Sequence, residues 1–155
     1  METMKLTIET AIQVQKPVSV VYEAIVNPEK MSHYFISEST GRMEEGREIT
    51  WKFPEFEIRF PVKVGSLRKD EYVSFYWDTE NGKTLVGITL ASGENNSTVV
   101  TITEKEADIN DAGLRWLAGN TQGWANFLAC LKAYLEYGIN LRKGAFDFMK
   151  DRFKK

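Results

Sequence analysis

Apolar and polar residues alternate along most of the first two thirds of the chain, which indicates a series of strands. A period of two is typical of a strand buried on one face, and residues 5–14 show it clearly. Asn81-Gly82 is a strong hairpin signal, because both central positions of a type I′ turn need positive φ. Turn-rich segments between the strands predict an antiparallel meander. Further strands are expected over 47–53, 56–64, 72–78, 84–91 and 98–105.

Two short helices are expected directly after the first strand. Residues 18–25 place their apolar side chains on one helical face. Asn27-Pro28 ends this helix, because the residue before a proline avoids the α region. A short second helix over 29–34 follows.

The last third of the chain has the three- and four-residue spacing of one long amphipathic helix. The pattern begins after Asp111, a suitable N-cap, and ends at Gly138, a suitable C′ residue. Glycine is costly inside a helix, so a break near Gly119-Asn120 is an open alternative. The apolar stripe consists of Leu117, Thr121, Trp124, Leu128, Leu131 and Leu135.

This order of elements predicts an α+β protein with a helix-grip fold. The stripe of the long helix must be buried, and the sheet is the only large apolar partner that the pattern offers. We expect a curved antiparallel sheet of about six or seven strands around the C-terminal helix, with two short helices after the first strand. In this interpretation residues 1–140 form one domain. Residues 141–155 form a basic amphipathic tail, with Phe146, Met149 and Phe153 among lysines and arginines.

Composition and charge exclude several classes of protein. Twenty Lys and Arg against 22 Asp and Glu give a net charge of −2, which argues against a nucleic-acid partner. One Cys and one His exclude an internal disulfide framework and a typical zinc site, so we expect no metal and no cofactor. The N-terminus has no signal-peptide pattern, and no run approaches the ~20 apolar residues of a membrane span. We therefore expect a cytoplasmic protein.

Three segments resemble one known family. Residues 17–25 followed by 27–31 are similar to the opening of the START-like SRPBCC superfamily, whose birch-pollen-allergen-like fold is the helix grip. Residues 73–77 resemble the middle strand of its AHSA-type branch, the homologues of the activator of heat-shock protein 90 ATPase. Residues 122–124, with the leucines that follow and Gly138, resemble the C-terminal helix of that branch. The resemblance covers roughly residues 5 to 140 and implies a ligand cavity between sheet and helix.

Aromatic residues are the main candidates for a functional site. The chain contains nine Phe, six Tyr and four Trp, many of them on strand faces or on the long helix. These rings either fill a core or line the apolar cavity that the resemblance implies. Asn120 and Thr121 are candidate polar groups that would fix a ligand's orientation. The predicted cavity residues are Trp51, Phe53, Phe56, Ile58, Phe60, Phe75, Trp77, Leu117, Asn120, Thr121, Trp124 and Leu128.

Catalytic residues find little support in the sequence. His33 has no nucleophile or acidic partner nearby in the chain, so we interpret it as a surface or packing residue. Cys130 is interpreted as a small buried side chain. Paired carboxylates do acid–base chemistry only when one of them is desolvated. Four carboxylates are instead expected on solvated turns or on an outer strand face, namely those of Glu55, Glu57, Asp78 and Glu80. We expect no catalytic residue.

Three functions remain open at this point. The first is a small non-enzymatic protein that holds an apolar or lipid-like ligand between the sheet and the C-terminal helix, which predicts a closed apolar cavity there. The second, implied by the resemblance, is a chaperone-associated protein that acts on heat-shock protein 90 or its bacterial equivalent through its surface. The third and weakest is a cyclase- or hydrolase-like enzyme, since some relatives do chemistry in the cavity. The oligomeric state and the identity of any ligand stay open.

Overall fold

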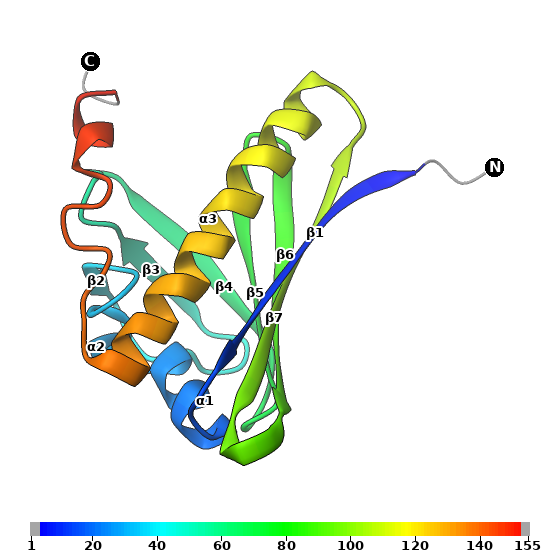
Figure 1. Ribbon diagram of the computed structural model, residues 1–155. Coiled ribbons are helices and arrows are strands. Elements are labelled where there is room, and N and C mark those ends of the chain that lie inside the picture. Colours follow the sequence, from blue (N-terminus) through cyan, green and yellow to red (C-terminus); the bar gives the residue numbers. More distant parts are fainter. Residues whose placement is uncertain (1–3, 153–155) are drawn as a thin grey trace.

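The computed structural model describes residues 4–152, whose strands form one curved antiparallel sheet in front of which a long helix lies (Figure 1). This is the predicted helix-grip arrangement. The strands are β1 (Lys5–Val14), β2 (Glu38–Ser39), β3 (Glu48–Lys52), β4 (Arg59–Arg68), β5 (Tyr72–Thr79), β6 (Gly82–Ser92) and β7 (Thr98–Asp108). The helices are α1 (Val18–Val26), α2 (Pro28–Met31), α3 (Asp111–Tyr137) and the 3-10 turns η1 (Glu94–Asn96) and η2 (Asp147–Arg152).

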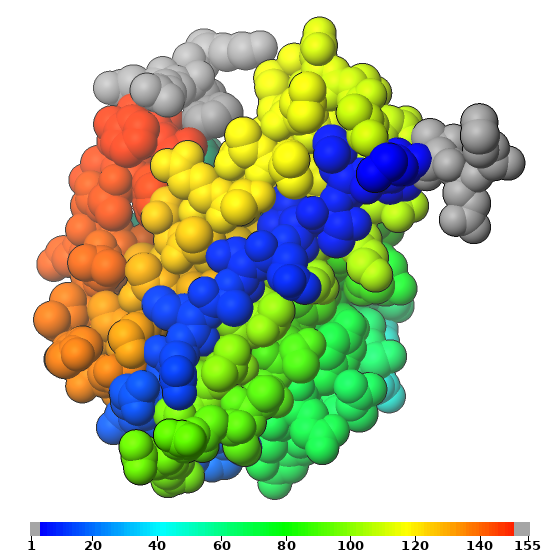
Figure 2. All heavy atoms as spheres, turned by 45° about the vertical axis from the view of Figure 1, so that its right-hand side comes forward, coloured from blue at the N-terminus to red at the C-terminus, as the bar shows by residue number. Residues whose placement is uncertain are grey.

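The sheet combines a meander with one long-range pairing. Its strand order is β1-β7-β6-β5-β4-β3-β2, so the first strand pairs with the last one. Ile8 lies opposite Glu104, Thr10 opposite Ile102 and Ile12 opposite Val100. The alternation in sequence therefore becomes an alternation between the concave and convex faces. Figure 2 shows β1 at this edge of the sheet, lying along α3.

The two short helices follow β1 as predicted. Helix α1 buries Val21, Ala24 and Ile25. The chain breaks at Asn27, whose side-chain oxygen accepts a hydrogen bond from the Glu29 amide and caps α2. Helix α2 covers only Pro28–Met31, shorter than the predicted 29–34, and turns follow it.

Helix α3 differs from the prediction at its start and in its continuity. The N-cap is Asn110 rather than Asp111, and its side chain accepts from the Gly113 amide at 2.8 Å. The helix runs unbroken through Gly119, because tertiary packing outweighs the low helix propensity of glycine. It ends as predicted at Gly138, which adopts a left-handed conformation with φ of 65°.

Two local strand predictions were wrong in detail. Strand β4 begins at Arg59, so Phe56 and Ile58 lie in the preceding loop and not on the strand. The β5–β6 hairpin is present, with Thr79 opposite Gly82. Of the Asn81-Gly82 pair only Gly82 has positive φ, at 92°, so the turn is not type I′.

Beyond Gly138 the chain reverses and returns beside the loop that precedes β4. Arg142 makes this contact through an ion pair with Glu55. The predicted tail is therefore attached to the domain through Arg142, and its described residues form turns and η2. Phe153, Lys154 and Lys155, which were part of that prediction, lie outside the described residues. Within residues 4–152, no helix has both the length and the apolar character to cross a membrane.

Candidate ligand pocket

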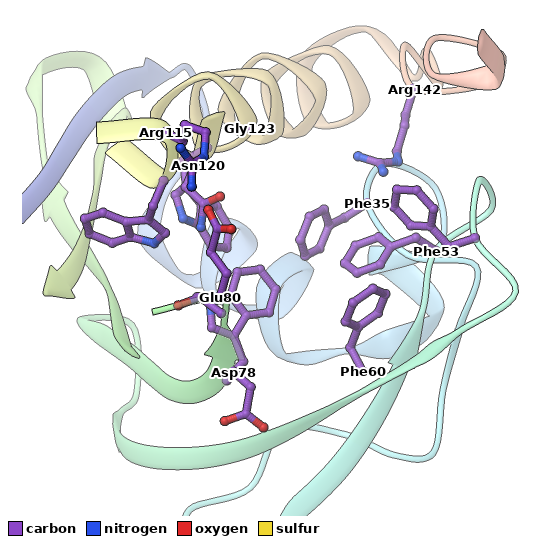
Figure 3. Close-up of a pocket in the computed structure, with 14 residues that line it drawn as sticks. Phe35, Phe53, Phe60, Asp78, Glu80, Arg115, Asn120, Gly123 and Arg142 are labelled. Atoms are coloured by element: carbon purple, nitrogen blue, oxygen red, sulfur yellow. The ribbon is translucent and has the colours of Figure 1, made fainter. Parts of the chain in front are cut away.

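A pocket of about 640 Å³ lies between the sheet and α3 (Figure 3). It is partly open to solvent, whereas the binding hypothesis predicted a closed cavity. Seven aromatic rings form most of its wall: Phe35, Phe53, Phe56, Phe60, Trp77, Trp116 and Trp124. The rest of the lining is polar or small: Asp78, Thr79, Glu80, Arg115, Asn120, Gly123 and Arg142.

The structure brings half of the predicted cavity residues together at this pocket. Those that line it are Phe53, Phe56, Phe60, Trp77, Asn120 and Trp124. Trp51, Phe75 and Leu128 are at most 1% exposed and lie in the filled core. The remaining three do not line the pocket: Leu117 and Thr121 are half-buried, and Ile58 is 60% exposed.

The orientation of α3 explains why Leu117 and Thr121 do not line the pocket. The predicted stripe ran through these two residues, but the buried side of α3 includes Trp116, Trp124 and Phe127. Trp124 belongs to the predicted stripe, whereas Trp116 and Phe127 lie beside it, so the buried face of α3 is rotated away from Leu117 and Thr121. Ile58 does not line the pocket for a different reason. It precedes β4, so the alternation of inward and outward side chains along that strand does not include it.

A fully buried carboxylate lies behind the part of the pocket wall that Trp77, Trp116 and Trp124 form, which we call the tryptophan end. Glu104, on β7, is 0% exposed and accepts hydrogen bonds from donors on three elements. The donors to Oε1 are Trp124 Nε1 at 2.8 Å and Asn120 Nδ2 at 3.1 Å. Those to Oε2 are Thr84 Oγ1 at 2.5 Å, Trp77 Nε1 at 3.0 Å and Trp116 Nε1 at 3.4 Å.

This network fixes the shape of the pocket wall. An ionised carboxylate is an acceptor-only group with about four lone-pair sites, and donors saturate it here without a cation. Four of the five donors belong to residues that line the pocket. Because each indole N–H is directed at Glu104, the ring positions are set by hydrogen bonds as well as by packing. We call Glu104 and its five donors the Glu104 network.

The other end of the pocket carries a buried ion pair. Arg142 Nη2 donates to Glu55 Oε2 at 2.9 Å, and their side chains are 14% and 3% exposed. The guanidinium also lies over the rings of Phe53, Phe35 and Phe146, with centroid distances of 5.4, 5.7 and 4.9 Å. Glu55 is thus buried and paired, which corrects its placement on a solvated turn.

The remaining candidate residues take ordinary structural positions. His33 is exposed and stacks on Tyr134 with a centroid distance of 5.3 Å. Cys130 is buried, and this burial raises the pKa of its thiol. Asp78 and Glu80 lie at the rim of the pocket, and Glu57 is exposed before β4. Among residues 4–152, no cluster of His, Cys, Asp or Glu has the make-up of a metal site.

Sequence reasoning missed Glu104 and Arg142. The signal for Glu104 was present, because it shares strand parity with Val100 and Ile102, which are both 0% exposed. A carboxylate at a core position of a strand needs buried donors, and tryptophans are the donors that such a core can supply. Arg142 had no comparable signal, because its partner Glu55 lies far away in the sequence.

Solved structures with the same fold include several bacterial proteins. Protein SSP2350 from Staphylococcus saprophyticus is 33% identical, with a TM-score of 0.78 over 88% of this chain and 96% of its own. The Aha1 dimer from Colwellia psychrerythraea is 22% identical, with a TM-score of 0.73 over 86% of this chain and 98% of its own. DynU16, described as a putative protein in the dynemicin biosynthetic locus, is 23% identical, with a TM-score of 0.76 over 86% of this chain and 48% of its own.

Comparison with curated proteins gives no match. A family model does match, and its description is activator of Hsp90 ATPase homolog 1-like protein. The match spans residues 15–136, from the end of β1 to the end of α3. The elements that form the pocket wall lie within this span, apart from Arg142. The chain therefore belongs to the activator of Hsp90 ATPase homolog 1-like family.

Proposed function

We propose that this protein is a small cytoplasmic, non-enzymatic binding protein that holds an apolar ligand in the pocket between the sheet and α3. The observation that carries the proposal is a pocket of about 640 Å³ walled by seven aromatic rings. Small-molecule sites typically measure roughly 300–1,000 Å³ and are apolar with a few polar groups. The size and the lining both meet this description.

Preorganisation supports the same function. A site whose walls are already fixed loses less conformational entropy when a ligand enters. The Glu104 network holds Trp77, Trp116 and Trp124 in place without a ligand. The rings therefore leave a space between them although hydrophobic packing alone would favour their closing on each other.

A pair of glycines on α3 provides a sharp test. Gly123 lines the pocket and Gly119 does not, and a Cβ at either position meets no atom within 4 Å. We expect Gly123→Leu to place its side chain in the pocket and to weaken binding of a neutral apolar fluorescent probe at least about tenfold, roughly 1.4 kcal/mol. Gly119→Leu makes the same change outside the pocket and should bind the probe like the wild type. Equal affinities for all three proteins would contradict the proposal.

The natural ligand can be sought directly. Native mass spectrometry of the protein purified from its own host should show a mass above that of the polypeptide, and denaturation should release it. The Gly123→Leu variant, purified in parallel, should carry less of this species than Gly119→Leu.

Family membership favours a second candidate, a role in chaperone activation. The family description names an activator of Hsp90 ATPase, and one solved structure with this fold is an Aha1 dimer. We propose that this role uses the surface and not the pocket. Its test is ATP turnover by the cognate chaperone with and without the protein. An unchanged rate would remove this candidate and leave the binding proposal intact.

A further inference from the structure

We propose that the tryptophan end of the pocket receives the positively charged head group of an amphiphilic ligand, such as an alkylammonium or a quaternary ammonium ion. The inference rests on the proposed function and adds the chemical class of the ligand. Its apolar body would lie toward the phenylalanine end, against Phe53, Phe56 and Phe60. The charge preference comes from the rings, from the carboxylate behind them and from the pocket rim.

The three indoles form a site suited to a cation. The rings of Trp77 and Trp124 lie 5.4 Å apart between centroids at an interplanar angle of 31°, and Trp116 lines the same end. An indole face attracts cations more strongly than any other aromatic side chain. Each of the three N–H groups donates to Glu104, so the indoles that line this end have no free N–H donor that would repel a cation.

Among the residues that the structure describes, no lysine or arginine pairs with the Glu104 carboxylate. All five of its donors are neutral groups. Hydrogen bonds stabilise this charge but do not cancel it, and a field in a buried region is screened less than in water. A cation bound among the indoles would therefore be attracted by the Glu104 carboxylate, which lies on the other side of the tryptophan rings from the pocket.

The rim at this end adds further acidic groups. Glu80 and Asp78 line the pocket together with Arg115. Lys83 lies 3.8 Å from Asp78, in an exposed pair that screens part of the Asp78 charge. Within residues 4–152, neither Arg115 nor Glu80 makes an ion pair. With Glu104 included, carboxylates outnumber the basic groups at this end.

The phenylalanine end shows the opposite situation. There the protein supplies its own cation, because the Arg142 guanidinium lies over three phenyl rings and pairs with Glu55. No lysine or arginine lies over an indole in the part of the chain that the structure describes. Within the described part of the pocket, the aromatic rings at the tryptophan end are thus not already covered by an arginine or lysine.

Three probes with the same alkyl chain separate charge from apolar character. We would compare decyltrimethylammonium, decanol and decyl sulfate below their micelle concentrations, by displacement of a neutral fluorescent probe from the pocket. We expect the cation to bind about tenfold tighter than decanol, the range of a desolvated cation–π contact. Equal or tighter binding of decanol or decyl sulfate would overturn the inference and leave the proposed function standing. Failure of all three probes to displace the reporter would overturn both.

A charge-neutral variant at the rim tests the origin of the preference. Glu80→Gln should weaken decyltrimethylammonium about twofold to fivefold more than it weakens decanol, the size of a partly screened charge interaction. Glu9→Gln is the matched control, because Glu9 is an exposed carboxylate on β1 outside the pocket. An equal effect of Glu80→Gln on both probes, or an equal effect of the two variants on the cation, would contradict the inference.

Discussion

Trp124 Nε1 donates a 2.8 Å hydrogen bond to Glu104 Oε1, which joins the middle of α3 to the inner face of β7. Both side chains are nearly inaccessible to solvent, at 3% and 0% exposure. The bond is charge-assisted, and such bonds are stronger than those between neutral groups. The same carboxylate binds Trp77 on β5 and Trp116 on α3, so one residue ties helix and sheet together at the pocket.

Removing the charge of Glu104 should destabilise the fold. Glu104→Gln keeps the size of the side chain but turns an amide NH₂ toward N–H donors, which leaves buried polar groups unpaired. We predict a loss of about 2–4 kcal/mol in the free energy of unfolding. Urea denaturation followed by circular dichroism measures this loss. Glu9→Gln, an exposed change on the neighbouring strand, should alter stability by less than about 0.5 kcal/mol. A loss no larger than that of Glu9→Gln would show that the network does not hold the fold.

The Arg142–Glu55 pair should anchor the segment after α3. Glu55→Gln leaves the guanidinium buried against phenyl rings without a counter-charge, and we predict a cost of about 1–3 kcal/mol. A double-mutant cycle with Arg142→Met should show a coupling energy of about 1 kcal/mol or more. The Arg59–Glu38 pair serves as a control. Its N···O distance of 2.9 Å equals that of Arg142–Glu55, but its side chains are 55% and 57% exposed. Glu38→Gln should cost less than about 0.5 kcal/mol, and a similar cost for both glutamates would argue against the anchor.

The two exposed glycines of α3 should be sites of stabilisation. At Gly119 and Gly123 an added Cβ meets no neighbour, and neither residue has positive φ. Alanine restores helix propensity at each position, so Gly119→Ala and Gly123→Ala should each raise the free energy of unfolding by about 1 kcal/mol. Thermal unfolding of the single variants and of the double variant checks this, with nearly additive gains. A loss of stability at either position would mean that α3 needs its glycines for packing.

Lowering the pH should remove the stabilising contribution of the surface ion pair between Glu23 and Arg42. Glu23 accepts from both terminal nitrogens of Arg42, at 2.6 and 2.9 Å, and this hydrogen bonding holds the pKa of Glu23 below its ordinary value of 4.5. Because the folded-state pKa is the lower one, the pair stabilises the protein above pH 4.5, and this contribution is lost as the pH falls through the folded-state value.

The expected effect is small because the side chains of Arg42 and Glu23 are 42% and 39% exposed. Glu23→Gln should lower stability at neutral pH by about 0.5–1 kcal/mol, and the difference from the wild type should vanish in strong acid. Denaturation at several pH values measures it, with the exposed Glu57→Gln as control. A difference that persists unchanged in acid would exclude the ion pair as its cause.

Most of the fold could be predicted from the sequence, because hydrophobic residues recur with the period of a strand or of a helix over long segments. Residues 5–14 and 98–105 alternate cleanly, and both are strands in the structure. The predictions were wrong where contacts with distant parts of the chain override the local hydrophobic pattern. In the sequence, Phe56 continues the alternation of apolar residues in β4. In the structure it lies in a loop, which the Glu55–Arg142 ion pair joins to the segment after α3.

The pocket was only partly predictable, for a physical reason. Periodicity shows that Trp51 and Trp77 share the inner face of the sheet, but it does not show which of them reaches the pocket. Both pack edge-on against Phe75, with centroid distances of 5.1 and 5.4 Å, yet Trp51 is buried in the core and Trp77 lines the pocket. The difference depends on the curvature of the sheet and the rotation of α3, which are set by the packing of all the elements together.

The central claim is that a ligand occupies the space between the sheet and α3, and the four tryptophans report on it. Three of them, Trp77, Trp116 and Trp124, line the pocket, and Trp51 is buried outside it. The most direct measurement is a ¹⁵N–¹H NMR titration of the four indole N–H signals with an apolar ligand. We predict that the three pocket signals shift in proportion to occupancy and that the Trp51 signal shifts least. Binding of the ligand without shifts of the three pocket signals would contradict it.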